Sequence, residues 1–183
     1  MDKLTLLADM LKQRQLIDHQ ITTLINRPAQ VGHVGEFIAA AIFDIELEMA
    51  ANNKAYDGRF KSGSLSGASV NVKWYTRDEN LLDISVGADL DFYLVLAGPK
   101  KMAGSPLGVG RPWVIESVYL IDAPYLIRSL VAAGKKIGIA TSVRQKYWCE
   151  AKIFPEQHSD KLLVRDDQRK MLSLFSYRAI CAI

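Results

Sequence analysis

The sequence predicts a single mixed α/β domain, in which helices cover a β-sheet. Three observations support this: an alternating segment from Ala68 to Tyr75, a continuous apolar run from Phe92 to Ala97, and amphipathic helical segments around them. The chain has 183 residues, of which 49% are hydrophobic and 23% are charged. This size and composition are typical of one globular domain spanning residues 1–183, and no repeat or linker marks a second.

The first 27 residues predict an amphipathic helix that precedes the rest of the fold. Apolar side chains recur at helical spacing, and Pro28 ends the pattern. Because an apolar face needs a covering surface, we expect this helix to dock on the core, with self-association as the alternative. The apolar residues are Leu4, Leu7, Met10, Leu11, Ile17, Ile21, Leu24 and Ile25.

A second helix is predicted to begin near Gly32 and to end near Asn52 and Asn53. Its first half is apolar almost all round, which indicates burial. Glu36 lies in this buried first turn, and a buried carboxylate needs a partner or the favourable end of the helix dipole. Asp44 follows eight residues later, close to two helical turns, and is a reserve carboxylate for the same face.

Two short strands joined by a Gly/Ser-rich turn follow. The first strand begins at Asp57, and the second alternates, so that Asn71 and Lys73 share one face and the apolar residues share the other. A lysine inside such a strand needs a partner, and Asp57 on the neighbouring strand is the obvious one. The alternative is structural: Asp57 caps the turn and Lys73 is solvated.

In this order, a Gly-Glu on a buried helix, an Asp-Gly opening a strand and a hydrophobic-x-hydrophobic-Lys strand resemble the PD-(D/E)XK nuclease superfamily. The similarity covers Val31 to Pro99, a nuclease-like core region at 31–99. It implies a restriction-endonuclease-like core, a mixed central sheet flanked by helices. The N-terminal helix would be an addition to that core, and residues 100–183 would supply the remaining sheet and helices.

The resemblance also implies residue roles and a chemistry. Glu36 matches the helix carboxylate, Asp57 the metal-binding Asp, and Lys73 the catalytic lysine, whereas Asn71 stands where the family has a second Asp or Glu. Asp57 and Glu36 would hold Mg²⁺ or Mn²⁺, Lys73 would orient the water or stabilise the phosphorane, and Asn71 would offer a carbonyl oxygen. The implied activity is metal-dependent endonucleolytic hydrolysis of DNA, in restriction, defence or mobile-element biology.

A second interpretation stays open because Asn71 departs from the family pattern. A neutral amide replaces an acid there, so the chain is alternatively a catalytically inactive subunit that binds nucleic acid or another protein. Phosphate contacts are expected from the Gly-rich loop at Lys100, Lys101 and Arg111, and from the mixed basic and aromatic segment with Arg144 and Lys146. A homodimer would suit cutting of both strands.

The remaining residues predict further alternation of strand and helix. The run Phe92 to Ala97 has the pattern of a central strand buried on both faces. Residues 112–121 predict a strand and 162–164 a brief one. Asp122 and Pro124 predict the start of a helix that Gly134 closes, and Asp166 predicts a last helix reaching Ile180.

Charge and cysteine content set only loose bounds on function. The formal net charge of +3 permits nucleic-acid binding without arguing for it. Cys149 and Cys181 are too few for a disulfide framework, so we expect reduced thiols in a cytoplasm. The N-terminus lacks a signal-peptide pattern, and no apolar run approaches the about 18 residues that suggest a membrane span.

Overall fold

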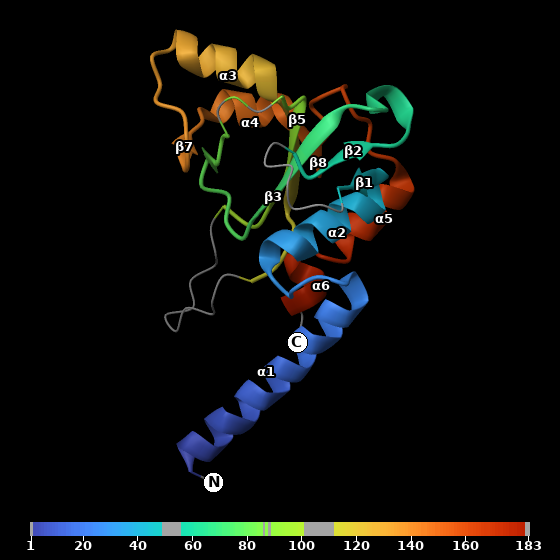
Figure 1. The fold of residues 1–183 in the computed structure, drawn as a ribbon, viewed down its shortest axis with the longest axis vertical. Helices are drawn as coiled ribbons and strands as arrows, with labels where there is room; N and C mark the ends of the chain where they lie inside the picture. Colours follow the sequence, from blue (N-terminus) through green and yellow to red (C-terminus); the bar gives the residue numbers. More distant parts are fainter. Residues whose placement is uncertain (1, 49–55, 86, 88, 101–111, 182–183) are drawn as a thin grey trace.

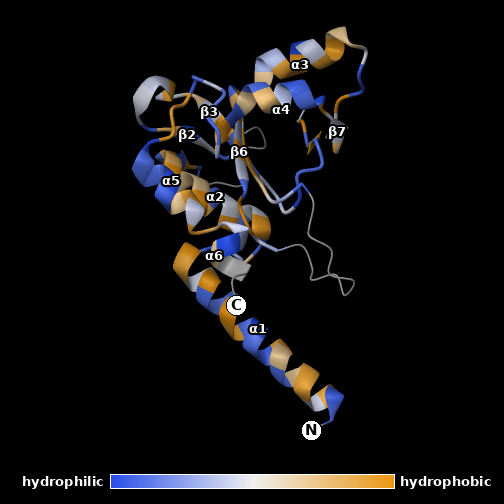
Figure 2. Cartoon of the chain, turned by 180° about the vertical axis from the view of Figure 1, so that it is seen from behind, coloured by the Kyte–Doolittle hydropathy of each residue, from blue (hydrophilic) through white to orange (hydrophobic). Residues whose placement is uncertain are grey.

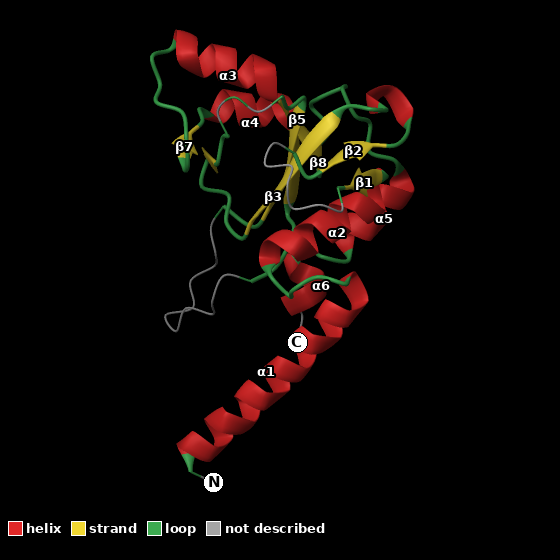
Figure 3. Ribbon diagram, in the orientation of Figure 1, coloured by secondary structure: helices red, strands yellow, loops and turns green. Residues whose placement is uncertain are grey.

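A computed structural model of the protein describes residues 2–48, 56–85, 87, 89–100 and 112–181. Its centre is a six-stranded sheet with helices against both faces (Figure 1; Figure 3). The helices are α1 (Lys3–Ile25), α2 (Val31–Phe43), α3 (Ala123–Ala132), α4 (Gln145–Ala151), α5 (Asp166–Ser173) and α6 (Tyr177–Cys181), with a short 3₁₀ turn at Gly63–Leu65. The predicted mixed α/β class is therefore confirmed.

The six strands of the main sheet run in the order β1-β2-β3-β5-β6-β8. Strands β3 and β5 are parallel, with Val70 opposite Phe92, and the other neighbours in the sheet are antiparallel. A separate antiparallel pair joins β4 to β7. The strands are β1 (Ile45–Leu47), β2 (Gly58–Phe60), β3 (Ser69–Tyr75), β4 (Leu81–Leu82), β5 (Phe92–Ala97), β6 (Ser117–Asp122), β7 (Thr141–Ser142) and β8 (Lys152–Phe154).

Two apolar cores lie on the two faces of this sheet. Val70, Val72 and Trp74 of β3 join the core that α2 and α5 cover, which confirms the alternation predicted for this strand. Tyr93 and Val95 of β5 join the second core, beneath α3 and α4. Strand β5 is buried on both faces beside β3, as its continuous apolar run predicted.

Helix α1 does not dock on the core. It has no buried residue, and Figure 1 shows it projecting away from the sheet and its covering helices. Only its last turns approach the domain, where the Ala29 N–H donates to Thr22 Oγ1 at 3.2 Å. The docking prediction was wrong because α2, α5, α3 and α4 already cover both sheet faces. Apolar side chains remain exposed along α1, as the hydropathy colours show (Figure 2).

Helix α2 is shorter than predicted. It ends at Phe43, where Asp44 takes a left-handed conformation with φ of 55°, and the chain enters β1 directly. The predicted end at Asn52 and Asn53 lies outside the described residues. In the acidic second half, Asp44 is the C-cap of α2 and Glu46 lies in β1, so this part is not helical. Asp44 is therefore no reserve carboxylate, and it instead pairs with Lys61 Nζ at 3.0 Å.

The C-terminal half follows the predicted alternation with shifted boundaries. Asp122 caps α3 as predicted, because its Oδ1 accepts from the Tyr125 N–H at 2.8 Å. The strand expected over 112–121 begins only at Ser117, and the strand expected over 162–164 is absent. The last helix is divided into α5 and α6. No helix within the described residues is long and apolar enough to cross a bilayer.

Candidate functional site

Glu36 reaches the sheet because α2 packs unusually close to β3. A Cβ atom at Gly35 would lie 2.9 Å from Trp74 Cβ, a separation that only glycine tolerates. The absence of a side chain at this position lets the first turns of α2 lie directly on the strand. Glu36 follows in sequence, so the Gly-Glu pair sets both the spacing of the helix and the position of its carboxylate.

Asp57 lies directly before β2 begins, where the pairing of β2 with β3 would otherwise stop. The Asp57 N–H donates to the Val70 carbonyl at 2.9 Å, and the Val72 N–H then donates to Asp57 Oδ2 at 2.7 Å. The carboxylate thus continues the ladder in place of a further strand residue. It lies at the β2 edge of β3, between the face that α2 covers and the face that carries Lys73.

Asn71 and Lys73 occupy one face of β3, as predicted. Asn71 is only 7% exposed, and its Oδ1 has no hydrogen-bond partner among the described residues. Lys73 is half-buried and makes no ion pair or hydrogen bond within the described part of the chain. The predicted direct pairing of Lys73 with Asp57 is therefore not formed, although the two charges still interact.

The electrostatics show that Asp57 lies close enough to Glu36 for its charge to oppose ionisation of the Glu36 carboxyl. Burial raises the pKa of Glu36 above its usual range, and the charge of Asp57 raises it further, against the lowering effects of Arg27 and His33. Burial likewise raises the pKa of Asp57, while the Val72 N–H, Lys73 and Arg27 act to lower it. Two partly desolvated carboxylates therefore lie close together, with Arg27 acting on both of them and Lys73 acting on Asp57.

Arg27 is the residue that sequence reasoning missed. Its guanidinium Nη1 donates to Glu36 Oε2 in a half-buried ion pair, and its charge also acts on Asp57. The residue lies in the turn between α1 and α2, so the N-terminal segment supplies a positive charge to the carboxylate pair. The available signal was a lone arginine directly before Pro28 and nine residues before a buried Glu36.

A hollow of about 320 Å³ adjoins this ion pair at the base of α1. His33 forms part of its wall, and its Nδ1 is fixed at 3.1 Å from the Pro28 carbonyl oxygen. The hollow combines basic and acidic side chains with apolar ones, beside the two carboxylates. Its lining residues are Ile25, Asn26, Arg27, His33, Phe37, Leu47 and Glu48.

Of the basic residues predicted to contact phosphates, those that the structure describes do not gather at this site. Lys100 Nζ lies 3.8 Å from Oδ2 of the buried Asp78, which also accepts from Tyr119. Lys101 and Arg111 lie outside the described residues. Arg144 is the N-cap of α4 and Lys146 lies in its first turn; α4 packs on β6, and β5 separates β6 from β3. Lys100, Arg144 and Lys146 are therefore not part of the Glu36–Asp57 site.

The donor atoms present suit a hard divalent cation. Two carboxylates and the unpaired Asn71 amide oxygen are oxygen ligands of the kind that Mg²⁺ and Mn²⁺ take, usually together with several waters. The described residues contain no group of three or more His, Cys, Asp or Glu placed to hold a metal ion. Any cation here would accordingly rest on Glu36 and Asp57, with Asn71 and water completing its shell.

No family model and no curated protein sequence matches the chain.

Proposed function

We propose that the protein is a divalent-cation-dependent endonuclease that hydrolyses phosphodiester bonds in DNA. The observation that carries the proposal is the convergence of Glu36 and Asp57 beside Lys73, with the buried, unpaired Oδ1 of Asn71 on the same strand. Buried like charges with raised pKa values are costly to a fold and cluster at functional sites. The order of these residues also resembles the PD-(D/E)XK nucleases with a restriction-endonuclease-like core.

Each residue has a role that its surroundings allow. Glu36 and Asp57 would hold Mg²⁺ or Mn²⁺, and the bound cation would lower the pKa of a water molecule and offset phosphate charge. Asn71 would add a neutral oxygen ligand or a contact to the scissile phosphate. Lys73 has no competing ion pair among the described residues, so its ammonium group is available to orient the attacking water and to stabilise charge developing on the phosphate.

The direct test is cleavage of supercoiled, linear and single-stranded DNA by the purified protein in Mg²⁺ and in Mn²⁺. Lys73→Ala is expected to reduce the rate about 100- to 1,000-fold, the usual effect of removing one donor that stabilises a transition state. Lys136→Ala is the matched control, since Lys136 is an exposed lysine beyond the end of α3. Equal cleavage by all three proteins would assign the activity to a contaminant and reject the proposed site.

A second candidate function is nucleic-acid binding without cleavage. Two observations favour it: Asn71 supplies a neutral amide where a third acid would strengthen cation binding, and Arg27 already offers Glu36 a permanent positive charge. This candidate predicts DNA affinity that falls steeply with salt concentration and is unchanged by EDTA. Asp57→Asn would leave that affinity intact, whereas it would abolish cation-dependent cleavage.

A further inference from the structure

The exposed helix α1 carries an apolar stripe with alternating three- and four-residue spacing. This is the spacing of positions that face a partner helix in a coiled coil. Its most exposed apolar members are leucines of the N-terminal half, with Leu4 73%, Leu7 52% and Leu11 50% exposed. The stripe comprises Leu4, Leu7, Leu11, Arg14, Asp18, Ile21 and Ile25.

The stripe is symmetric about residue 16, so that two copies in antiparallel orientation would bring matching side chains opposite each other. Positions 7 and 25, 11 and 21, and 14 and 18 are equidistant from that point, and the first two pairs are apolar. The third pair joins opposite charges, Arg14 and Asp18. Within one helix the Arg14 Nε lies 3.7 Å from Asp18 Oδ2, and the two side chains are 77% and 43% exposed, so both remain accessible to a partner.

We propose that α1 pairs in antiparallel orientation with α1 of a second copy of this chain, with Arg14 of each copy opposite Asp18 of the other. Charge selects the orientation. A parallel pair would place Arg14 against Arg14 and Asp18 against Asp18, which is repulsive, whereas the antiparallel pair makes two attractive contacts across the two-fold axis. The proposal stands independently of any nuclease activity.

The proposed pairing also determines where the partner's N-terminus would lie. Leu7 of one copy would meet Ile25 of the other, and Ile25 lines the hollow at the base of α1 together with Phe37, which is 39% exposed. The partner's Leu4 would extend onto this apolar rim. An overlap from residue 7 to residue 25 is about 28 Å long at 1.5 Å per residue, so the two domains would lie at opposite ends of the pair.

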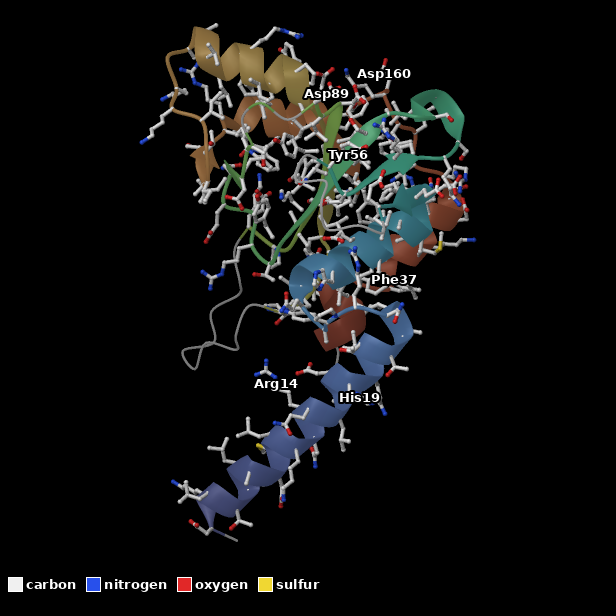
Figure 4. The ribbon with its side chains drawn as sticks, viewed as in Figure 1. Arg14, His19, Phe37, Tyr56, Asp89 and Asp160 are labelled. Atoms are coloured by element: carbon white, nitrogen blue, oxygen red, sulfur yellow. The ribbon has the colours of Figure 1, made fainter. Side chains whose placement is uncertain are left out.

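Figure 4 shows Arg14 and His19 projecting from opposite sides of α1. The alternating three- and four-residue spacing places the stripe on the side of Arg14. Leu16 offers a matched control on the other side, because it follows Leu7 by nine residues, or two and a half turns. It is 64% exposed, comparable with Leu7 and Leu11. Substituting any of these exposed leucines leaves both cores of the domain intact.

The first experiment measures the mass of the full chain by sedimentation equilibrium over a range of protein concentrations. We expect the wild-type protein and Leu16→Asp to be dimers, and the Leu7→Asp/Leu11→Asp variant to show a dissociation constant raised by about 100-fold or more. Circular dichroism of each variant checks that the domain is folded. A monomeric wild type, or a dimer that the double substitution leaves unchanged, would overturn the proposal.

Charge reversal and cysteine cross-linking then test the orientation. Arg14→Glu should weaken the dimer and the double change Arg14→Glu/Asp18→Arg should restore it. Leu11→Cys/Ile21→Cys should form a disulfide-linked dimer in which peptide mapping finds position 11 joined to position 21, whereas Leu11→Cys alone should not cross-link. Joining of position 11 to itself would contradict the antiparallel arrangement. A monomeric chain that sediments with anionic vesicles would assign the stripe to a membrane surface instead.

Discussion

Asp57 serves the fold and the proposed chemistry through different properties, and two substitutions separate them. Its Oδ2 accepts the Val72 N–H at 2.7 Å, while its charge sits beside Glu36 and Lys73. Asp57→Asn keeps an oxygen acceptor and removes the charge. Asp57→Ala removes both. The difference in stability between the two variants measures the contribution of the hydrogen bond. The loss of cation binding that both variants share shows the contribution of the charge.

The magnitudes follow from the surroundings of the carboxylate. Leaving the part-buried Val72 N–H without an acceptor costs about 1–3 kcal/mol, so we expect Asp57→Ala to be less stable than Asp57→Asn by that amount. For a chain of this size the difference corresponds to a Tm lower by about 2–12 °C. Because burial raises the pKa of Asp57, its charge opposes folding at neutral pH, and Asp57→Asn should match or exceed wild type without a cation.

Cation binding adds a second, independent signal. A cation present at about ten times its dissociation constant stabilises the folded state by about 1.4 kcal/mol, which raises Tm by about 3–6 °C. Wild type should show this rise, and both Asp57 variants should lose it.

Differential scanning calorimetry in EDTA and in millimolar Mg²⁺ or Mn²⁺ measures all of these effects. Asp83→Asn is a control in which the same side chain is changed in the same way. The Asp83 carboxylate accepts hydrogen bonds from the Ala140 N–H and the Tyr75 hydroxyl, away from Glu36. It should retain the cation-induced rise. The reasoning would be refuted if Asp57→Asn kept a wild-type rise in Tm, or if the alanine and asparagine variants were equally stable.

Three further predictions follow from the same site. Without a cation, the free energy of unfolding should fall as pH rises from about 4 through the raised pKa values of Glu36 and Asp57. The reason is that these two carboxyl groups lose their protons at lower pH in the unfolded chain than in the folded one. A calorimetric profile in which stability rises over this range would contradict the prediction. Arg27→Gln removes the charge that competes for Glu36, so titration calorimetry should find tighter Mg²⁺ binding, about 10-fold or more, and weaker binding would show that Arg27 supports the site. Asn71→Asp adds a third acid, and it should strengthen Mg²⁺ binding and increase DNA cleavage; unchanged binding would place Asn71 outside the cation site.

The central sheet was predictable because its strands carry strong local patterns. Alternation from Ser69 to Tyr75 predicts which side chains share a face, and the structure places Val70, Val72 and Trp74 together in one core, although Ser69 and Asn71 on the other face are also buried. The apolar run from Phe92 to Ala97 predicts a strand buried on both faces, which the structure confirms. The end of α2 was harder to predict from the sequence. The left-handed conformation of Asp44 accompanies its ion pair with Lys61 and the pairing of β1 with β2. These contacts join segments that the composition of the sequence does not connect.

The candidate site shows the same limit. Glu36, Asp57 and Lys73 were predicted individually, because buried or strand-embedded charges are conspicuous in sequence. Arg27 was missed because its relation to Glu36 arises from the turn between two helices, and a single arginine before a proline is unremarkable. The exposed α1 was also mispredicted, since periodicity indicates an apolar face and does not identify the surface that covers it.

The missing side chain at Gly35 makes the proposed catalytic geometry intolerant of a single methyl group. A Cβ there would meet Trp74 Cβ at 2.9 Å and Cε3 at 3.2 Å, and these atoms belong to a buried ring in a β-strand that cannot easily yield. Gly35→Ala should therefore tilt or lift α2 and carry Glu36 with it, at a cost of about 1–3 kcal/mol in stability. Loss of stability without any loss of cation binding would show that Glu36 is not held by this contact. If cation binding is lost as well, a substitution at a position that takes no part in the chemistry is as damaging to the site as loss of the Glu36 carboxylate itself.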